Sequence, residues 1–535
     1  MRRLPSARAI LPIAIVLLAL ALRLPGLDRW PPAIHQDEAS NGVDGWSLLT
    51  TGADRAGRTA PVFLEGFGAG DNRTSLYAWL TIPGIALFGP GTFATRLPAA
   101  LAGAWTVLAT FLLVRRVRGT GTAACAALVL AATPWSICLS RFGHEASLTP
   151  AFAVTALWLA ARERPRWIVA GIVLAAGMYT YPSFRIFLPL VFIAAAILRA
   201  GPRPDRAAAT RLVIAFAAGC VPLAVASIAH PERLLARGAS ASVFGNLPFG
   251  IALWAFMQQY AAHFLPRFLI LHGDGNPLHS PAGMGELLRP EAISLVLGIV
   301  FAVRRRDAWD RFFLAWLLLY PIASAASLGD RPEYVPHSLR AAVGLPVFEI
   351  IGAQGIIAAC TFIAARGRRG VIGARVALGM WGMAAAANLI LFMTAFTGSY
   401  ARAVEPLYHA ADVRAIRYLA AHRDRFQAAV IRAGESDPQV YIYSILYGLQ
   451  TPREYRSVAK TITETETFHL VRRAGPLFYI QEPADLDQDR SLIHGARIWA
   501  IVEPGQMRSG RLVAAFPYPD GTPGVEVREL DLPPD

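Results

Sequence analysis

Residues 93–114 read FATRLPAALAGAWTVLATFLLV, an apolar run that ends directly before the basic cluster Arg115-Arg116-Val117-Arg118. Blocks of this kind recur along the 535-residue chain, which is 54% hydrophobic and only 16% charged. A soluble protein of average composition carries about 25% charged residues, and roughly 20 apolar residues are enough to cross a bilayer. The sequence therefore predicts an α-helical polytopic membrane protein.

We expect about eleven transmembrane helices, each on one apolar block. Several blocks are short, so their boundaries are fixed only to within a few residues. The predicted spans are residues 10–27, 93–114, 120–138, 146–161, 167–181, 185–199, 212–229, 291–303, 312–327, 341–364 and 376–396.

The arginines between these blocks indicate how the chain is oriented. With the N-terminus inside, the predicted cytoplasmic segments hold 21 arginines in 48 residues, and the outer segments hold 12 in 154. Cytoplasmic loops are enriched in basic residues. We therefore expect a multi-pass protein of the inner (plasma) membrane with a cytoplasmic N-terminus. The net charge of +14 is spread over these short clusters, which argues against nucleic acid as a partner.

Two domains are predicted. Residues 1–396 form the transmembrane domain, whose long outer loops, 28–92 and 230–290, contain interfacial helices near 76–88 and 249–271. Residues 397–535 read as a small extracytoplasmic α/β domain that opens with a helix near 405–424. Its predicted strands, separated by turn signals, are residues 428–432, 439–446, 477–481, 496–502, 510–516 and 523–529.

Several kinds of chemistry are excluded by what the loops can hold. The longest cytoplasmic loop has about 13 residues, too few for a nucleotide-binding fold, and the chain has no Walker sequence or strand-bounded G-x-G-x-x-G. The four cysteines lie inside apolar blocks without ligand spacing. No cofactor is predicted; a divalent metal is not indicated by the sequence, because no His-Glu-x-x-His or other ligand spacing occurs. Substrates must reach the protein from the membrane or its outer face.

The strongest local signal is the acidic pair in Pro31-Pro32-Ala33-Ile34-His35-Gln36-Asp37-Glu38-Ala39, just past the first span. Both carboxylates fall at the start of a helix predicted over 37–50, where the helix dipole favours negative charge. One interpretation is a cap on a solvated loop. The other is an acidic site at the membrane surface, because a carboxylate near lipid is costly unless it is paired or used.

Arginines occur at the mouths of several predicted outer loops. Each is either a lipid-headgroup anchor or part of a shared anion site, since guanidinium suits phosphate. The arginines are Arg73, Arg141, Arg185 and Arg340. The polar residues near them are His144, Glu145, Tyr181 and His337.

The ordered set of these motifs resembles the GT-C membrane glycosyltransferases, specifically the bacterial dolichyl-phosphate-mannose–protein mannosyltransferase-like proteins. The resemblance covers roughly residues 10–365. It rests on Asp37-Glu38, Arg73, Phe88-Gly89-Pro90, the run from Arg96 to Gly103, Pro134-Trp135, Ser140-Arg141, the run from Tyr179 to Arg185 and the run from Pro336 to Ala341.

The resemblance implies a GT-C fold and a polyprenyl-phosphate-linked sugar donor that is bound from the outer leaflet. It implies that Asp37 is the catalytic base, assisted by Glu145, with Glu38 either positioning the acceptor or capping its helix. It also implies that the lipid phosphate is bound by Arg73, Arg141, Arg185 and Arg340, with weaker substrate contacts from His144, Tyr181 and His337. The eukaryotic relatives carry an inserted lumenal domain with sequence repeats that this sequence does not show, so the resemblance does not extend to a protein acceptor, and the acceptor stays open between a glycan, a lipid and a protein.

The implied reaction is an inverting sugar transfer to an acceptor hydroxyl. Two alternatives stay open. An O-antigen ligase or oligosaccharide polymerase would take a diphosphate-linked donor instead of a monophosphate. A non-enzymatic lipid or sugar transporter would also be polytopic, but transporters place their polar groups near the membrane midplane, whereas here these groups cluster at one predicted face.

Overall fold

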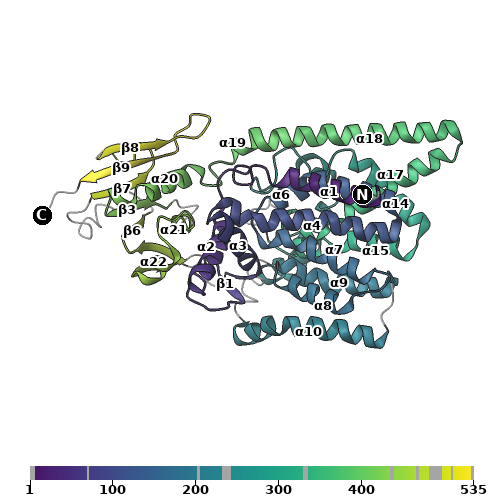
Figure 1. Ribbon diagram of the computed structural model, residues 1–535, viewed down its shortest axis with the longest axis horizontal. Helices are drawn as coiled ribbons and strands as arrows, with labels where there is room; N and C mark the ends of the chain where they lie inside the picture. The colour runs from purple at the N-terminus through teal and green to yellow at the C-terminus, as the bar shows by residue number, and fades with distance from the viewer. Residues whose placement is uncertain are drawn as a thin grey trace, which may run out of the picture. The chain divides into compact units, whose positions relative to one another are not determined.

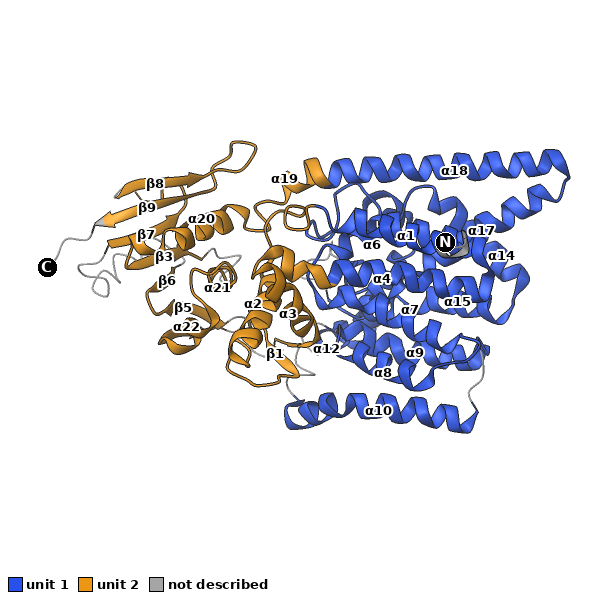
Figure 2. Ribbon diagram, viewed as in Figure 1, with its two compact units in different colours: residues 1–25, 99–396 blue, residues 26–98, 397–535 orange. Residues whose placement is uncertain are grey.

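The computed structural model describes residues 7–68, 71–201, 205–231, 242–328, 335–433, 439–465, 469–480, 497–507 and 510–531. Its elements are labelled in Figure 1. The chain divides into two compact units, which Figure 2 distinguishes by colour. Unit 1 comprises residues 1–25 and 99–396, and unit 2 comprises residues 26–98 and 397–535.

Unit 1 is built from helices, and each predicted span falls on one or more of them (Figure 1). Its longer helices are α1 (Ala7–Arg23), most of α4 (Thr92–Arg118), α5 (Thr120–Ala132), α6 (Pro134–Ser140), α7 (Thr149–Ala160), α8 (Trp167–Met178), α9 (Pro182–Leu198), α10 (Arg206–Ala229), α13 (Phe249–Ala262), α14 (Glu291–Arg305), α15 (Ala308–Leu319), α17 (Val347–Ala364) and α18 (Arg368–Ala395). Its short elements are η1 (Glu145–Leu148), α12 (Val243–Asn246), η2 (Arg267–His272), α16 (Ile322–Ala325) and η4 (Ala342–Gly344).

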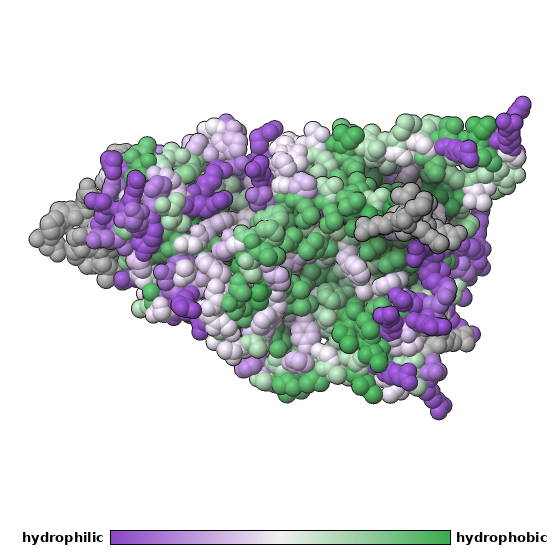
Figure 3. Space-filling model, in the orientation of Figure 1, coloured by the Kyte–Doolittle hydropathy of each residue, from purple (hydrophilic) through white to green (hydrophobic). Residues whose placement is uncertain are grey.

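The helices of unit 1 are suited to a membrane. Figure 3 shows hydrophobic residues over much of the visible surface of this unit and hydrophilic ones where its helices end at the right of the view. Exposed apolar side chains include Ile228, Ile197 and Met383. Contiguous apolar surface of this extent marks a surface that does not face water. The chain is a multi-pass membrane protein.

Fewer helices than the predicted eleven pass a strict length test. Among the described residues, four helices are long and apolar enough to cross a bilayer, or five if α5 and α6, which meet at 59°, form one broken span. The remaining apolar helices are too short, since α7, α8 and α15 have 12 residues each. In the broken pair, Thr133 with Pro134 separates α5 from α6.

Two helices of unit 1 pack backbone against backbone. A Cβ added to Gly298 of α14 would lie 2.0 Å from the carbonyl oxygen of Ile351 in α17, and one added to Gly355 would lie 2.3 Å from the amide nitrogen of Gly298. Only glycine fits at such a distance, and small residues are typical of membrane helix contacts. The position of α17 relative to α14 therefore depends on these two glycines.

Unit 2 contains the α/β region that the sequence predicted at the C-terminal end. Its seven-stranded sheet has the order β4-β5-β6-β3-β7-β9-β8. β3 pairs in parallel with β6 and β7, and the remaining pairs are antiparallel. The strands are β3 (Ala428–Arg432), β4 (Lys460–Glu464), β5 (His469–Ala474), β6 (Leu477–Ile480), β7 (Arg497–Val502), β8 (Arg511–Phe516) and β9 (Val525–Asp531). The helices are α19 (Ala401–Ala403), α20 (Ala410–Ala421), α21 (Tyr441–Leu446) and α22 (Pro452–Ser457).

The predicted strand at 439–446 was wrong. The run Tyr-Ile-Tyr-Ser-Ile-Leu forms α21, in which every residue is buried. A short apolar run that is buried on all sides has no period that separates helix from strand. Strands β4 and β5 were both missed. The residues of the edge strand β4 are mostly exposed and polar. The helix predicted from residue 405 begins at Ala410.

The loop of residues 28–92 belongs to the same compact unit as the C-terminal residues. It contains α2 (Gln36–Thr51), the hairpin of β1 (Phe63–Glu65) and β2 (Asn72–Thr74), and α3 (Leu76–Phe88), the last at the predicted position. One hydrophobic core joins Val43 of α2 to Ile442 and Leu446 of α21. The two units also divide the chain after residue 396, but residues 26–98, which were predicted within the transmembrane domain, belong to unit 2, because α2 completes the core of the C-terminal region.

We predict that Gly298→Ala lowers the melting temperature of the detergent-solubilised protein. The new methyl group has no room against the Ile351 carbonyl, and overpacking of this kind costs about 1–3 kcal/mol. Thermal unfolding followed by size-exclusion chromatography measures the effect. The matched control is Gly379→Ala in α18, where a Cβ would meet nothing within 4 Å. Equal melting temperatures for the two variants would contradict the proposed close contact.

Candidate functional site

The acidic pair stands at the beginning of α2, in unit 2. His35 is the N-cap, and its ring nitrogen Nδ1 accepts a hydrogen bond from the Asp37 amide at 3.3 Å. Glu38 Oε2 in turn accepts from the His35 amide at 3.1 Å. This reciprocal arrangement satisfies amides that a helix start leaves without partners. Of the two alternatives left open for Glu38, the structure shows the cap.

Glu38 is also one half of a buried ion pair. Its Oε1 lies 2.8 Å from Nε of Arg96, its Oε2 lies 2.9 Å from Nη2, and neither side chain is exposed to solvent. The remaining nitrogen of Arg96 donates to the carbonyls of Leu27 and Pro31. Both carboxylate oxygens of Glu38 are therefore engaged. This revises the expectation that Glu38 takes part in catalysis, because it has no surface that a substrate can reach.

Asp37 has a different environment from its neighbour. Its side chain keeps 32% of its surface exposed, and its carboxylate lies 3.7 Å from the ring of His35. Its main-chain carbonyl accepts a hydrogen bond from Arg73 at 3.0 Å. The backbone of Asp37 is held on both sides while its carboxylate remains accessible. This is the arrangement that a general base requires.

Arg73 was predicted to bind the lipid phosphate, but its guanidinium forms hydrogen bonds with residues of α2. Besides the Asp37 carbonyl it donates to the hydroxyl of Ser40. It also lies 4.0 Å from the carboxylate of Asp44, and its side chain is only 9% exposed. Burial raises the pKa of Asp44 in spite of Arg55 and Arg73. The geometry makes Arg73 a positioning residue for the helix that carries Asp37.

Arg141, a second predicted phosphate ligand, is buried in unit 1 and holds the end of α1. It donates to the carbonyl of Arg23 at 2.7 Å and to that of Pro25 at 3.0 Å. Its guanidinium also lies 5.7 Å from the ring centre of Phe396. A side chain that is 1% exposed and already bonded to carbonyls does not offer the open fork that phosphate recognition needs. The expectation for Arg141 is therefore corrected to a structural role.

Several predicted residues of unit 1 do come together. The ring of His144 lies 5.2 Å from that of Tyr181 and 5.8 Å from that of Phe142. Phe142 lies 5.9 Å from His279, whose ring centre is 4.6 Å from that of His337. Three predicted residues, His144, Tyr181 and His337, thus belong to one continuous row of rings. These distances define the ring row, residues 181, 144, 142, 279 and 337.

The remaining predicted residues of unit 1 flank this row. Glu145 opens η1, is 3% exposed and lies 3.3 Å from Nε2 of His144. Arg340 donates through Nη1 to the Ser327 hydroxyl at 2.8 Å and to a carbonyl. Arg185 donates through Nε to the Met178 carbonyl at 3.0 Å. Both arginines are only partly buried, and each has guanidinium nitrogens outside these bonds.

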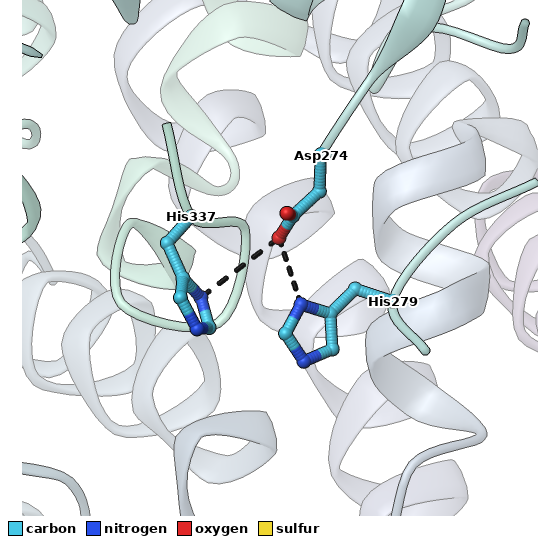
Figure 4. Close-up of side chains that lie close together, drawn as sticks. All are labelled: Asp274, His279 and His337. Carbon is cyan, nitrogen blue, oxygen red and sulfur yellow. Dashed lines mark hydrogen bonds and ion pairs between the residues drawn. The ribbon is translucent and has the colours of Figure 1, made fainter. Parts of the chain in front are cut away.

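Two functional candidates beside His337, Asp274 and His279, were not predicted from the sequence. The Asp274 carboxylate lies 2.8 Å from Nδ1 of His279 and 3.8 Å from Nδ1 of His337, as Figure 4 shows. These three side chains are the residues that could hold a metal ion among those the structure describes. The available signal was the run from His272 to His279, in which two histidines stand on either side of Gly273-Asp274-Gly275.

The charges of this triad are set by its surroundings. Burial raises the pKa of the Asp274 carboxyl, but His279 and His337 outweigh that effect and hold it well below its ordinary value. Burial holds the pKa of His337 well below its ordinary value. At neutral pH the carboxylate is therefore ionised and the His337 ring is neutral.

We predict that Glu38→Gln destabilises the protein, because it leaves the Arg96 guanidinium buried without a counter-charge. Removing one partner of a buried pair costs about 3–5 kcal/mol. Denaturant unfolding in detergent measures the change. Glu65→Gln is the matched control, since Glu65 pairs with Arg58 but is 47% exposed, and such pairs contribute about 0–1 kcal/mol. If both variants unfold at the wild-type midpoint, the pair does not hold the loop.

Comparisons with known proteins agree with this architecture. Residues 72–228 match the family model described as dolichyl-phosphate-mannose-protein mannosyltransferase. No curated protein sequence matches the chain significantly. The structure of ArnT from Cupriavidus metallidurans bound to undecaprenyl phosphate is similar with a TM-score of 0.58 at 15% identity, and the alignment covers 98% of both chains. The same protein in the apo state gives a TM-score of 0.53 at 15% identity, again over 98% of both chains.

A third similar structure is the apo oligosaccharyltransferase of Archaeoglobus fulgidus. Its TM-score is 0.50 at 12% identity, and the alignment covers 83% of this chain and 64% of that one. These solved structures are GT-C glycosyltransferases. The chain therefore has the GT-C fold, and over residues 72–228 it is similar to the dolichyl-phosphate-mannose-protein mannosyltransferases.

Proposed function

We propose that the chain is an integral-membrane glycosyltransferase that moves a sugar from a polyprenyl-phosphate-linked donor to an acceptor hydroxyl, with inversion at the anomeric carbon. The GT-C fold supports this class of enzyme, and the similar ArnT structure contains undecaprenyl phosphate. The apolar surface of unit 1 supports a donor that arrives through the bilayer.

The observation that carries the proposal is the contrast between two neighbouring carboxylates. Glu38 is buried and fully bonded, whereas Asp37 is 32% exposed and held through its backbone. Environments that separate adjacent carboxylates in this way assign them different roles. Asp37 is the base: it takes the proton of the acceptor hydroxyl as that oxygen attacks the anomeric carbon, and the bond from that carbon to the phosphate oxygen breaks.

The departing group is a lipid phosphate, which is already ionised and needs positive charge more than a proton. Preorganised charge aimed at the leaving group is a large part of such catalysis. Of the four predicted phosphate ligands, Arg185 and Arg340 remain candidates because only part of each guanidinium is bonded to residues that the structure describes. Glu145, beside His144, remains the candidate for assisting the base.

The arginine-rich short connections favour a cytoplasmic N-terminus, transfer at the outer face of the inner membrane and an extracytoplasmic C-terminal region. In that orientation α2 and its carboxylates stand outside with the C-terminal residues of unit 2. The acceptor is a hydroxyl-bearing glycan, lipid or protein of the cell envelope. The transferred sugar is a hexose or a pentose.

We predict that Asp37→Asn lowers turnover about 10²–10⁴-fold, the range typical for loss of a general base. The purified protein in detergent receives polyprenyl phosphate that carries a labelled hexose or pentose, with cell-envelope extract as the source of acceptor. Release of free polyprenyl phosphate is the measurement.

Asp28→Asn is the matched control for this variant. Asp28 is an exposed carboxylate of the same loop, and its removal should leave turnover within about twofold of wild type, as expected for surface substitutions. Melting temperatures of both variants are compared with wild type. Wild-type turnover in Asp37→Asn would contradict the assignment of the base and make Glu145 the next residue to test.

A further inference from the structure

Asp274, His279 and His337 lie on two loops of unit 1 that are fixed against one another. The first loop follows η2 and precedes α14, and the second precedes η4. The Ser338 amide and hydroxyl donate to Oδ2 of Asp274 at 2.7 and 2.9 Å. These bonds place the His337 ring beside a carboxylate from the other loop.

Trp135, at the start of α6, is hydrogen-bonded to both loops. Its amide donates to the Glu286 carbonyl at 2.9 Å, and its indole nitrogen donates to the Ser338 carbonyl at 3.1 Å. The Asp274 amide donates to Glu286 Oε1 at 2.9 Å. The triad is therefore held by a bonded frame rather than by two loose loops.

The turn before Asp274 admits only glycine. Gly273 has φ +74°, and a Cβ there would lie 2.5 Å from the Met284 carbonyl. This turn directs Asp274 inwards, and the Asn276 amide binds its carboxylate at 2.8 Å. Bonds that orient a carboxylate in this way are typical of the groups behind a metal ligand.

The triad has the donor set of a transition-metal site. One carboxylate and two imidazoles suit Zn²⁺ and related ions, whereas Ca²⁺ and Mg²⁺ prefer oxygen ligands alone. One ligand atom from each of the three residues lies within 4.8 Å of the others. Tetrahedral Zn²⁺ with bonds of about 2.0–2.1 Å separates its ligands by roughly 3.3 Å. The observed separations of 2.8 and 3.8 Å from the carboxylate lie on either side of that value.

A hydrogen-bonded Asp-His pair alone would explain only part of this geometry. His337 is 9% exposed, and its Nδ1 faces the carboxylate at 3.8 Å, too far for a hydrogen bond (Figure 4). Among the described residues this nitrogen has no hydrogen-bond partner. A buried nitrogen without a partner is costly. A cation between the ring and the carboxylate would satisfy it.

We propose that Asp274, His279 and His337 bind one divalent transition-metal ion, with Zn²⁺ as the type case, and that the ion cross-links the two loops. Three protein ligands leave at least one coordination position for a small oxygen ligand. The inference rests on these three side chains and is independent of the proposed transferase activity.

Direct binding is the test. The full-length protein, purified without a polyhistidine tag, is treated with EDTA, desalted and titrated with ZnCl₂ by calorimetry. A parallel titration with CoCl₂ follows the visible absorption of the bound ion. We predict one ion per chain, a cobalt spectrum of nitrogen and oxygen ligands, and a higher melting temperature with the metal, since a ligand of the folded state stabilises it.

His337→Gln is the decisive variant, because the ring makes no hydrogen bond through Nδ1 that folding would lose. Its affinity for Zn²⁺ should fall at least about tenfold, since even groups behind the ligands contribute 10–100-fold. His272→Gln is the matched control: this histidine ends η2, two residues before Asp274, and is exposed. It should bind as wild type does.

Asp274→Asn provides a second variant and should abolish both the cobalt spectrum and the stabilisation by Zn²⁺. Its melting temperature without metal reports any separate loss of the Ser338 bonds. The proposal is overturned if folded wild type binds no ion, or if wild type, His337→Gln and His272→Gln bind equally, which would mean adventitious binding only.

Discussion

The buried pair of Glu38 and Arg96 is the interaction on which the conformation of residues 27–51 depends. Two charges removed from water are costly unless they meet in good geometry and every remaining donor is bonded. Both conditions hold. Nε and Nη2 of Arg96 donate to the Glu38 carboxylate at 2.8 and 2.9 Å, and Nη1 donates to two carbonyls. The pair fixes the start of α2 and therefore the neighbouring carboxylate, Asp37. One acid of the pair orients the loop and the other stays accessible.

The C-terminal region gains a structural explanation from the same helix. Its sequence has no catalytic signature, yet α21 supplies Ile442 and Leu446 to the core in which Val43 of α2 is buried. Arg456 of α22 also donates to the Thr51 hydroxyl at the end of α2. The helix that begins with the acidic pair is thus supported along its length. The C-terminal residues therefore support the helix that carries Asp37.

Much of the fold followed from local patterns, whereas the site followed only in part. Apolar blocks predicted the helices of unit 1, and the run from Leu76 to Phe88 predicted α3 at its observed bounds. The acidic pair was found because two adjacent carboxylates near a membrane are rare. The arginines were misjudged because a sequence gives their charge but not the carbonyls that occupy them, as Arg141 illustrates. Asp274 and His279 were missed because their partner His337 lies far along the chain.

A glycosyltransferase of the proposed class consumes a monophosphate-linked sugar. The most direct measurement gives the wild-type protein in liposomes two donors side by side, a polyprenyl-phosphate sugar and a polyprenyl-diphosphate oligosaccharide, with cell-envelope extract as acceptor. We predict acceptor-dependent release of polyprenyl phosphate from the first donor and no consumption of the second. Consumption of the diphosphate donor, with every monophosphate-linked hexose and pentose left intact, would contradict it.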